Sequence, residues 1–294
     1  MDSLPVPAAP APANQQTARS KARRLLRGFG PTGVVGLAII VFWLVVAVAG
    51  PALLPRNFGA MGTVFAPISA EHWLGTDYLG RDMLARIVDG ARFTVVLALI
   101  ATLFASGTGI TLALLAAASG RWIDASLSRG LDTLTAIPSK MFALLMVAAF
   151  GSATPMLIVT ASIIYVPGAY RIARSLAVNI NALDYVTVAR TRGEGIAYIM
   201  RREILPNIVG PMLADFGLRF VYVVLLLAAL SFLGLGVQPP AADWGSLVRE
   251  NIGALAEGGP SVVAPALAIA SLTISVNLVI DSLPGRAARA RREG

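Results

Sequence analysis

Residues 171–206 read RIARSLAVNINALDYVTVARTRGEGIAYIMRREILP, the one long arginine-rich interruption in a very apolar chain. Of the 294 residues, 56% are hydrophobic and only 14% are charged, and long uncharged runs lie on both sides of this stretch. A helical membrane crossing needs about 20 apolar residues, a length that these runs reach. They are also too continuous for the short alternating segments of a membrane barrel. The sequence therefore predicts a helical membrane protein in which the 171–206 stretch lies between spans.

The uncharged runs set the number of crossings at five or six. Four of them suffice for one crossing each: 34–54, 93–119, 209–236 apart from Asp215 and Arg219, and 261–283 apart from Asp281. A further uncharged run lies between Lys140 and Arg171, but the sequence GSATP at 151–155 interrupts it. This interruption permits either one long tilted helix or the outer parts of two helices.

The positions of the basic residues favour six spans. With six spans and a cytoplasmic N-terminus, the N-terminal tail, the 121–129 turn, the 171–206 stretch and the C-terminal tail all lie inside. The loop residues left outside are then Arg56, Arg81, Arg86, Arg92 and Arg249. With five spans, the arginines of 171–206 and of the C-terminal tail would move outside, against the positive-inside bias. The predicted fold is therefore all-α and polytopic, with six transmembrane helices and both termini in the cytoplasm.

Charged residues inside the predicted spans are the candidates for a translocation path. The third helix is expected to start near Leu127 and to bring Asp132 and Lys140 into or close to the membrane. A charge near the centre of a helix costs about 2.5–3.5 kcal/mol there. Lys140 either faces a water-filled path or extends its long side chain to the interface. Asp215 and Arg219, four residues apart on the fifth span, either line or gate a path or form a buried staple on one helix face.

The predicted organisation runs from tail to tail. Its parts are a disordered cytoplasmic tail at 1–18, an amphipathic interfacial helix at 19–30, the first transmembrane helix with an extracytoplasmic loop at 31–92, a five-helix core at 93–283 with a cytoplasmic loop at 184–206, and a basic cytoplasmic tail at 284–294. A cleaved signal peptide is the alternative for the first span. Its apolar run is long for that role, and no clear small-residue cleavage site follows it.

Several kinds of chemistry are excluded by composition. The chain has no cysteine and a single histidine, His72, which argues against disulfides, thiolate catalysis and histidine-rich or zinc sites. The only lysines, Lys21 and Lys140, do not stand in a Gly-Lys-Ser/Thr phosphate loop, and no G-x-S-x-G or H-E-x-x-H motif is present. We therefore expect no catalytic residue, no metal site and no cofactor on this chain. The net charge of +8 lies beside the spans, so it indicates topology rather than nucleic-acid binding.

The 184–206 loop has the pattern of two short helices. Gly193 breaks the first helix, which begins at Asp184, and Leu205-Pro206 is expected to end the second. The apolar positions of the second helix fall on one face: Ile196, Ile199, Met200 and Ile204. Two helices joined at a glycine, each with an apolar face and a basic rim, form a rigid knob able to enter a groove on another protein. Composition alone equally permits a solvated loop or one lying on anionic lipid.

Three stretches resemble one family. DYVTVARTRGEGIAYIMRREILPNIVGP (184–211) is similar to the EAA loop of ABC importer permeases, with matches at Ala189, Gly193 and Ile204-Leu205-Pro206. Thr187 and Val188 depart from the general motif. HWLGTDYLGRDMLARIVDGARFTVV (72–96) and SFLGLGVQPPAADWGSLV (231–248) resemble two signatures of the C-type permease subunits of dipeptide, oligopeptide and nickel importers.

That resemblance implies a subunit of an importer of di- or oligopeptides in the cytoplasmic (inner) membrane. The implied partners are a homologous second permease, two ATPase subunits that bind ATP and Mg, an extracytoplasmic substrate-binding protein and membrane lipid. In this scheme Gly193 sets the angle between the short helices, apolar residues enter a groove of the ATPase, and arginines meet acidic groups at its rim. The residues implied in coupling are Asp184, Ala189, Arg190, Arg192, Gly193, Glu194, Ile196, Ile199, Met200, Leu205 and Pro206. Glu194 stands where the family commonly has a small residue.

The resemblance also implies an extracytoplasmic mouth that contacts the binding protein. Its residues are His72, Asp77, Arg81, Asp82, Gln238 and Trp244. Acidic and basic residues balance in the loop that carries His72, Asp77, Arg81 and Asp82, which favours an ordered, hydrogen-bonded structure. A lone histidine beside Trp73 is expected to be structural.

Two other classes of protein remain open from the residues. A secondary transporter would use the same intramembrane charges, and it would typically show an internal repeat. A noncatalytic membrane anchor of a complex would explain the 184–206 knob but would not need Lys140.

Overall fold

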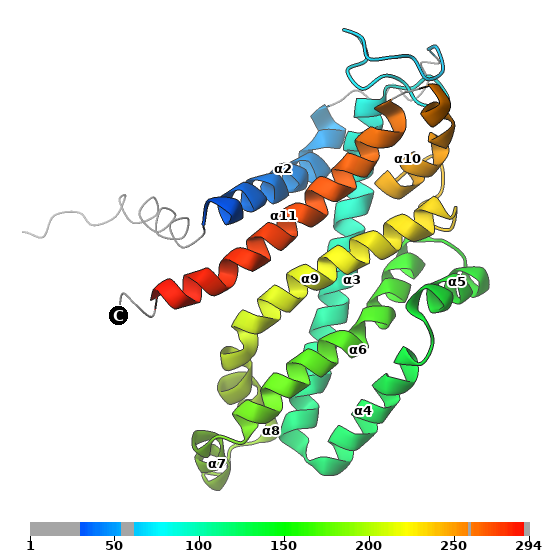
Figure 1. Cartoon of the computed structure of the whole chain (residues 1–294). Helices are drawn as coiled ribbons and strands as arrows, with labels where there is room; N and C mark the ends of the chain where they lie inside the picture. The colour runs from blue at the N-terminus through cyan, green and yellow to red at the C-terminus, as the bar shows by residue number, and fades with distance from the viewer. Residues whose placement is uncertain (1–29, 54–61, 258–259, 291–294) are drawn as a thin grey trace, which may run out of the picture.

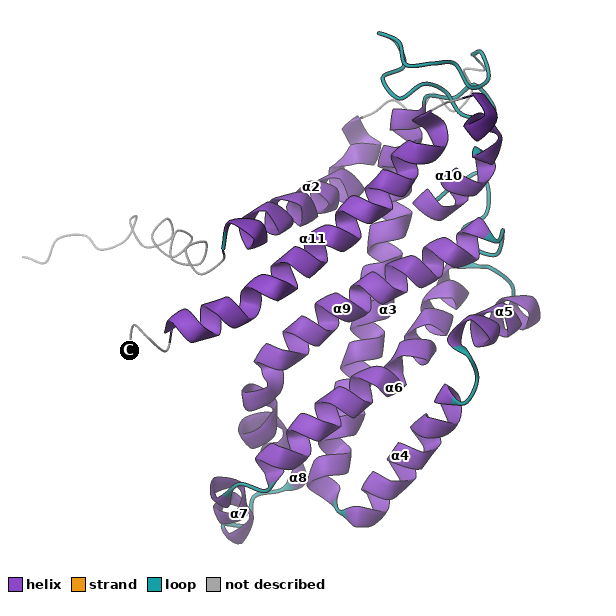
Figure 2. Cartoon of the chain, viewed as in Figure 1, coloured by secondary structure: helices purple, strands orange, loops and turns teal. Residues whose placement is uncertain are grey.

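The computed structural model describes residues 30–53, 62–257 and 260–290, and this part of the chain is built from helices (Figure 2). One isolated antiparallel bridge joins Thr76 and Asp82. The longer helices are α2 (Pro31–Leu53), α3 (Met83–Ser119), α4 (Arg121–Thr135), α5 (Ser139–Phe150), α6 (Thr154–Asn181), α9 (Leu205–Phe232) and α11 (Pro260–Ala290). The shorter ones are α7 (Asp184–Thr191), α8 (Ile196–Tyr198), a π-helical segment (Ile199–Ile204), α10 (Trp244–Glu250) and a 3₁₀ turn (Ile252–Glu257).

The described residues contain five helices long and apolar enough to cross a membrane, and α4 with α5 makes a sixth passage. In Figure 1, α3 runs from the end that carries α10 to the end that carries α7, and α6 runs the same way. The chain must therefore return between them, and α4 and α5 together make that return. We call these two ends of the molecule the α10 end and the α7 end. The predicted all-α, polytopic fold is confirmed, and the described helices give the predicted six spans when α4 and α5 are counted as one broken span.

The break in the third span has a local cause. The axes of α4 and α5 differ by 81° at the break. Pro138 lacks an N–H and disfavours helical backbone at Ile137, so a straight helix cannot pass through this point. The predicted start near Leu127 is wrong, since α4 begins at Arg121. Lys140 is exposed in the first turn of α5, just after the break.

Helices α3 and α6 form a close pair through small residues. The buried face of α3 carries alanines at 91, 98, 101, 105, 113 and 116, and α6 presents alanines at 161, 169, 173 and 177. Where the helices cross, a Cβ atom added to Gly109 would lie 2.5 Å from Cβ of Ala169 and 2.9 Å from the backbone nitrogen of Tyr170. Lipid gives apolar side chains no reason to associate, so close van der Waals contact between small residues is what joins membrane helices.

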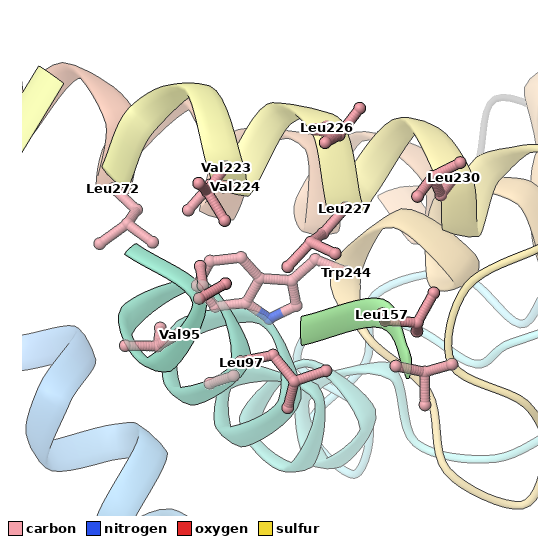
Figure 3. Close-up of a cluster of buried hydrophobic side chains, with 14 of the residues drawn as sticks. Val95, Leu97, Leu157, Val223, Val224, Leu226, Leu227, Leu230, Trp244 and Leu272 are labelled. Carbon is pink, nitrogen blue, oxygen red and sulfur yellow. The ribbon is translucent and has the colours of Figure 1, made fainter. Parts of the chain in front are cut away.

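A second centre of packing surrounds Trp244, at the start of α10. Its indole is buried among aliphatic side chains of α3, α6, α9 and α11, as Figure 3 shows for Val95, Leu157 and Leu227. The indole N–H donates to the carbonyl of Ile87 at 2.9 Å, and the Trp244 backbone N–H donates to the Thr94 hydroxyl at 3.0 Å. The short α10 helix is thereby fixed to the start of α3.

The predicted organisation differs from the helices in two places. Helix α3 begins at Met83, with Asp82 as its N-cap, so the boundary expected between residues 92 and 93 falls inside a helix. Helix α11 likewise continues through the boundary expected between 283 and 284. The 1–18 tail and all but the last residue of the 19–30 helix lie outside the described residues.

Replacing Gly109 by alanine is expected to separate α3 from α6. The added methyl group meets backbone and side-chain atoms that cannot move independently, so the fold should lose about 1–3 kcal/mol of stability. The measurement is the thermal unfolding midpoint of the purified protein in lipid nanodiscs. Gly107→Ala is the matched control on the same helix, since nothing lies within 4 Å of its added Cβ. Equal midpoints for the two variants would contradict the packing described above.

Candidate functional site

The 184–206 loop lies at the α7 end of the bundle, beyond α6 (Figure 1). Helix α7 stops in a regular way, because Gly193 has a φ of +83°, a conformation that glycine adopts without strain. The N–H of Gly193 donates to the carbonyl of Arg190 at 3.0 Å, and that of Glu194 donates to Ala189 at 3.2 Å. This is the hydrogen-bond pattern of a Schellman cap. The predicted break at Gly193 is confirmed, and the cap fixes the direction in which the chain leaves α7.

One side of the loop is packed into the molecule. Val186, Ile199 and Ile204 are buried with residues from the ends of α3 and α6, and Met200 packs against this cluster. Ile199 is only 1% exposed. The expectation that Ile199 enters a groove of another protein is therefore wrong, because its apolar face is already covered by the chain's own helices.

Arg190 joins the loop to the ends of two helices. Its guanidinium donates to the carbonyl of Ala118 at 3.1 Å and to the side-chain oxygen of Asn181 at 2.9 Å. The Ala118 carbonyl lies in the last turn of α3, where it has no partner within its own helix. Arg190 therefore uses part of its hydrogen-bonding capacity within this chain and not on a partner. Arg192 is exposed, with its Nη2 atom 3.8 Å from Oε1 of Glu194.

The other side of the loop presents apolar side chains to the exterior. We call this set of exposed residues the outer patch: Tyr185 and Val188 of α7 with Ile196 and Tyr198 of α8, each at least 38% exposed. Exposed arginines at 192, 201 and 202 lie in the same loop, as does Asp184. An exposed apolar surface with a charged rim is the usual form of a protein contact site.

The second short helix is continuous with the fifth span. Residues Ile196–Phe232 form one uninterrupted helix. Pro206 lies in the first turn of α9 directly after the π-helical segment, where the altered hydrogen-bond register accommodates its missing N–H. The prediction that Leu205-Pro206 ends this helix is wrong. A displacement of the loop therefore acts directly on a transmembrane helix.

Asp215 and Arg219 form a buried pair, with 9% and 6% of each residue exposed. Arg219 donates to both carboxylate oxygens of Asp215, from Nε at 3.0 Å and from Nη2 at 2.7 Å. Its Nη1 donates to the backbone carbonyl of Tyr165 on α6 at 3.0 Å. In the single chain this geometry is that of a staple between α9 and α6. Lys140 lies beside the α4–α5 break, where a cavity of about 240 Å³ opens between the ends of these helices and Ile163 and Ile164 of α6.

The charged residues expected at the mouth form an ordered network at the α10 end. Asp77 is fully buried and accepts hydrogen bonds from the N–H groups of Leu79 and Arg81, both at 2.9 Å, and from Arg81 Nε at 2.7 Å. Arg86 of α3 donates to Glu250 of α10 at 2.7 Å. The order expected from balanced charges is present, but burial removes Asp77 from any contact with another protein.

Of the remaining residues expected at the mouth, some are exposed and others are buried or paired within the chain. Nδ1 of His72 lies 2.9 Å from the carboxylate of Asp82, which also caps α3 by accepting from the N–H of Ala85. His72 therefore has a structural partner. Gln238 is exposed, whereas Trp244 is fully buried and cannot meet a partner. Within the described residues, no group of three or more His, Asp or Glu is placed to hold a metal ion.

Asp243 is a structural residue that the sequence reasoning missed. Its carboxylate accepts from the N–H of Ser246 at 2.8 Å and from the Ser231 hydroxyl, while the Ser246 hydroxyl lies 3.0 Å from the Asp243 N–H. These bonds form a capping box for α10. Burial raises the pKa of the Asp243 carboxyl, against the opposing effect of these hydrogen bonds. The available signal was an aspartate three residues before a serine at the start of a helix.

The comparisons with known proteins assign the chain to a family. Residues 109–292 match the model of the binding-protein-dependent transport system inner membrane component family. The chain belongs to this family. It is therefore a multi-pass inner-membrane permease subunit of an ABC transport system, the membrane component rather than the ATPase. This assignment sets aside the secondary transporter and the membrane anchor.

Three relatives illustrate the family. The permease is 32% identical over 284 residues to the dipeptide transport system permease protein DppC of Alkalihalophilus pseudofirmus, an alignment that covers 95% of this chain and 93% of that one. It is 34% identical to the glutathione transport system permease protein GsiD of Pectobacterium atrosepticum and 34% identical to the di/tripeptide transport system permease protein DppC of Pseudomonas aeruginosa. Each of these two alignments covers 73% of this chain and 71% of the relative.

Asp243→Asn should change the pH dependence of the permease's stability. A carboxyl whose pKa is raised by folding stabilises the fold below its ordinary pKa, and this contribution is lost as pH rises through the folded-state value. Asparagine keeps an oxygen for the cap but cannot ionise. The unfolding midpoint of the variant relative to the wild type should therefore increase as pH rises above about 4, the ordinary pKa of an aspartate. Asp243→Ala, which loses the cap at a cost of about 1 kcal/mol, is the control. If the difference in unfolding midpoint between the Asn variant and the wild type does not change with pH, ionisation of Asp243 does not destabilise the fold.

Proposed function

We propose that this permease moves di- or oligopeptides into the cell and is driven through its 184–206 loop by ATPase subunits. The observation that carries this proposal is the outer patch of Tyr185, Val188, Ile196 and Tyr198, borne on a loop that is fused to a transmembrane helix. Sites built to receive force need an exposed contact surface and a rigid connection to what moves. Peptides are favoured as the transported solutes because the relatives are named for dipeptide, di/tripeptide and glutathione transport.

The loop divides the coupling work between its two sides. The inner side, with Val186 and Ile199, fixes the loop to α3 and α6, and the outer patch enters a groove of an ATPase subunit. Asp184, Arg192 and Glu194 lie at the rim of this contact. ATP-driven closure of the ATPase pair displaces the loop as a rigid body, and the bundle rocks between its two open states. In this scheme ATP and Mg are bound by the ATPase subunits and this chain performs no chemistry of its own.

The complete importer is proposed to contain a homologous second permease, two ATPase subunits and an extracytoplasmic binding protein. The surface of α4 is the argument for a second permease. None of the residues of α4 is buried in the single chain, so the helix is free to be covered by a partner. Exposed apolar residues Met141, Leu145 and Phe150 extend this uncovered surface along α5. Lys140 and the cavity beside it would then lie at the boundary between the two permeases, on the translocation path.

The binding protein is proposed to dock on the α10 end, which then faces away from the cytoplasm. His72, Arg81, Asp82 and Gln238 remain partly or fully exposed there. The ionic network beneath them holds the loop in one shape, so the docking surface is formed before the binding protein arrives.

Val188→Glu tests the coupling contact. A carboxylate buried without a partner in an apolar contact costs more than the roughly 1.4 kcal/mol that corresponds to tenfold in affinity. The ATPase subunits co-expressed with the variant should therefore co-purify at least about tenfold less well. Ile252→Glu is the matched control, because Ile252 is 52% exposed in the 3₁₀ turn that follows α10, far along the chain from the loop. If both variants retain the ATPase equally, the outer patch is not the docking surface.

A transport assay tests the solute class. Proteoliposomes containing the assembled importer should take up a labelled dipeptide only when ATP is inside with the ATPase subunits and binding protein is outside. A proton or sodium gradient without ATP should give no uptake, since no ion coupling is proposed. Uptake of an amino acid or sugar in preference to any peptide tested would overturn the assignment of peptides.

A further inference from the structure

Arg219 makes contacts that a simple surface ion pair would not require. Its guanidinium uses two N–H groups on Asp215 of its own helix and a third on the Tyr165 carbonyl of α6. The opposite wall of this site is Gly168, where an added Cβ would lie 2.6 Å from Nη1 of Arg219. The guanidinium thus occupies the space that a side chain on α6 would otherwise fill.

A second hydrogen bond runs the other way between the same two helices. The hydroxyl of Tyr165 on α6 donates to the backbone carbonyl of Tyr222 on α9 at 3.0 Å, and the two rings stack with centroids 6.4 Å apart. Tyr222 lies one helical turn after Arg219. Two reciprocal side-chain-to-backbone bonds therefore connect α6 and α9 within one turn. We call this group of Asp215, Arg219, Tyr165 and Gly168 the clasp.

The position of the clasp matters because α9 is part of the continuous helix Ile196–Phe232. The start of this helix belongs to the 184–206 loop, and Arg219 lies farther along the same rigid element. A bidentate pair buried between helices has few alternative geometries, since sliding α9 along α6 would leave a buried guanidinium N–H without an acceptor.

We propose that Arg219 is a positioning residue that makes α6 and α9 move as one body during the transport cycle. The displacement received at Ile196–Ile204 passes along α9, and the clasp carries it across to α6. This inference rests on the proposed function for the source of the displacement. It assigns Arg219 to transmission between helices and not to contact with the transported solute.

The test uses the natural absence of cysteine from this chain. Tyr165→Cys and Tyr222→Cys place one thiol on each helix, and a short bifunctional thiol reagent links them in the assembled importer. This background loses the Tyr165 hydroxyl bond and the ring stacking but keeps the Arg219 bond to the backbone carbonyl of residue 165, so it is the reference for every comparison. If the helices move as one body, the link forms with equal yield in the resting and ATP-bound complex, and linked complexes keep their uptake. Leu218→Cys with Tyr222→Cys, both on α9, is the matched control for the reagent.

A rescue experiment then isolates Arg219. In the same background, Asp215→Asn with Arg219→Gln removes both charges together and leaves no unpaired ion. Uptake should fall by on the order of tenfold, the usual size of coupling between sites, and linking the two thiols should restore it. Where this variant assembles poorly, Gly168→Ala serves instead, because its methyl group displaces the guanidinium while both charges stay.

Three results would overturn the proposal. The first is a loss of uptake when the helices are linked with Arg219 intact, which would mean that the helices must slide. Loss of uptake that linking does not restore indicates that Arg219 contacts the solute or only stabilises the fold. Retained uptake in both clasp variants means that α6 and α9 stay together without it. The linking yield in the two nucleotide states does not depend on the solute, so the clasp is tested even if peptides prove to be the wrong solute class.

Discussion

The close contact between α3 and α6 is the interaction on which the rest of the structure depends. In lipid, apolar side chains gain nothing by leaving their surroundings, so two helices stay together only where their backbones can approach. The alanines of both helices and Gly109 permit that approach. The pair then supplies fixed surfaces at both ends of the molecule, for the 184–206 loop at one end and for Trp244 of α10 at the other.

In its proposed coupling role, the 184–206 loop has to meet two demands that usually conflict, since a contact surface must be exposed and a mechanical connection must be rigid. Here the two demands fall on opposite sides of the same short helices. Val186, Ile199 and Ile204 secure the inner side, and Tyr185, Val188 and Ile196 remain exposed on the outer side. The glycine cap of α7 and the continuous helix into α9 leave few soft joints between the contact surface and the membrane. The Arg219 clasp extends this rigidity from α9 to its neighbour.

At the α10 end, rigidity comes from charge and not from small residues. Asp77, Arg81, Arg86 and Glu250 combine into one buried network between a loop and two helices. Removing one member would leave an uncompensated buried charge, which is far more costly than removing a surface pair. The loop that precedes α3 is thereby held by buried ionic contacts to α3 and α10.

The features that could be predicted from the sequence alone are those that depend on residues close together in the chain. The spans, the interruption at 151–155 between α5 and α6, and the glycine turn after α7 depend on neighbouring residues, so hydropathy and turn chemistry indicated them correctly. The break at Pro138 was not predicted. An apolar face on the second loop helix was also visible, but periodicity does not say what such a face meets. Only the packing of α3 and α6 decided that Ile199 is buried while Ile196 is exposed. The partner of Arg219 on α6 is likewise a backbone carbonyl, which leaves no trace in residue identity. Covalent neighbours are written in the sequence, whereas contacts between distant helices exist only after folding has brought them together.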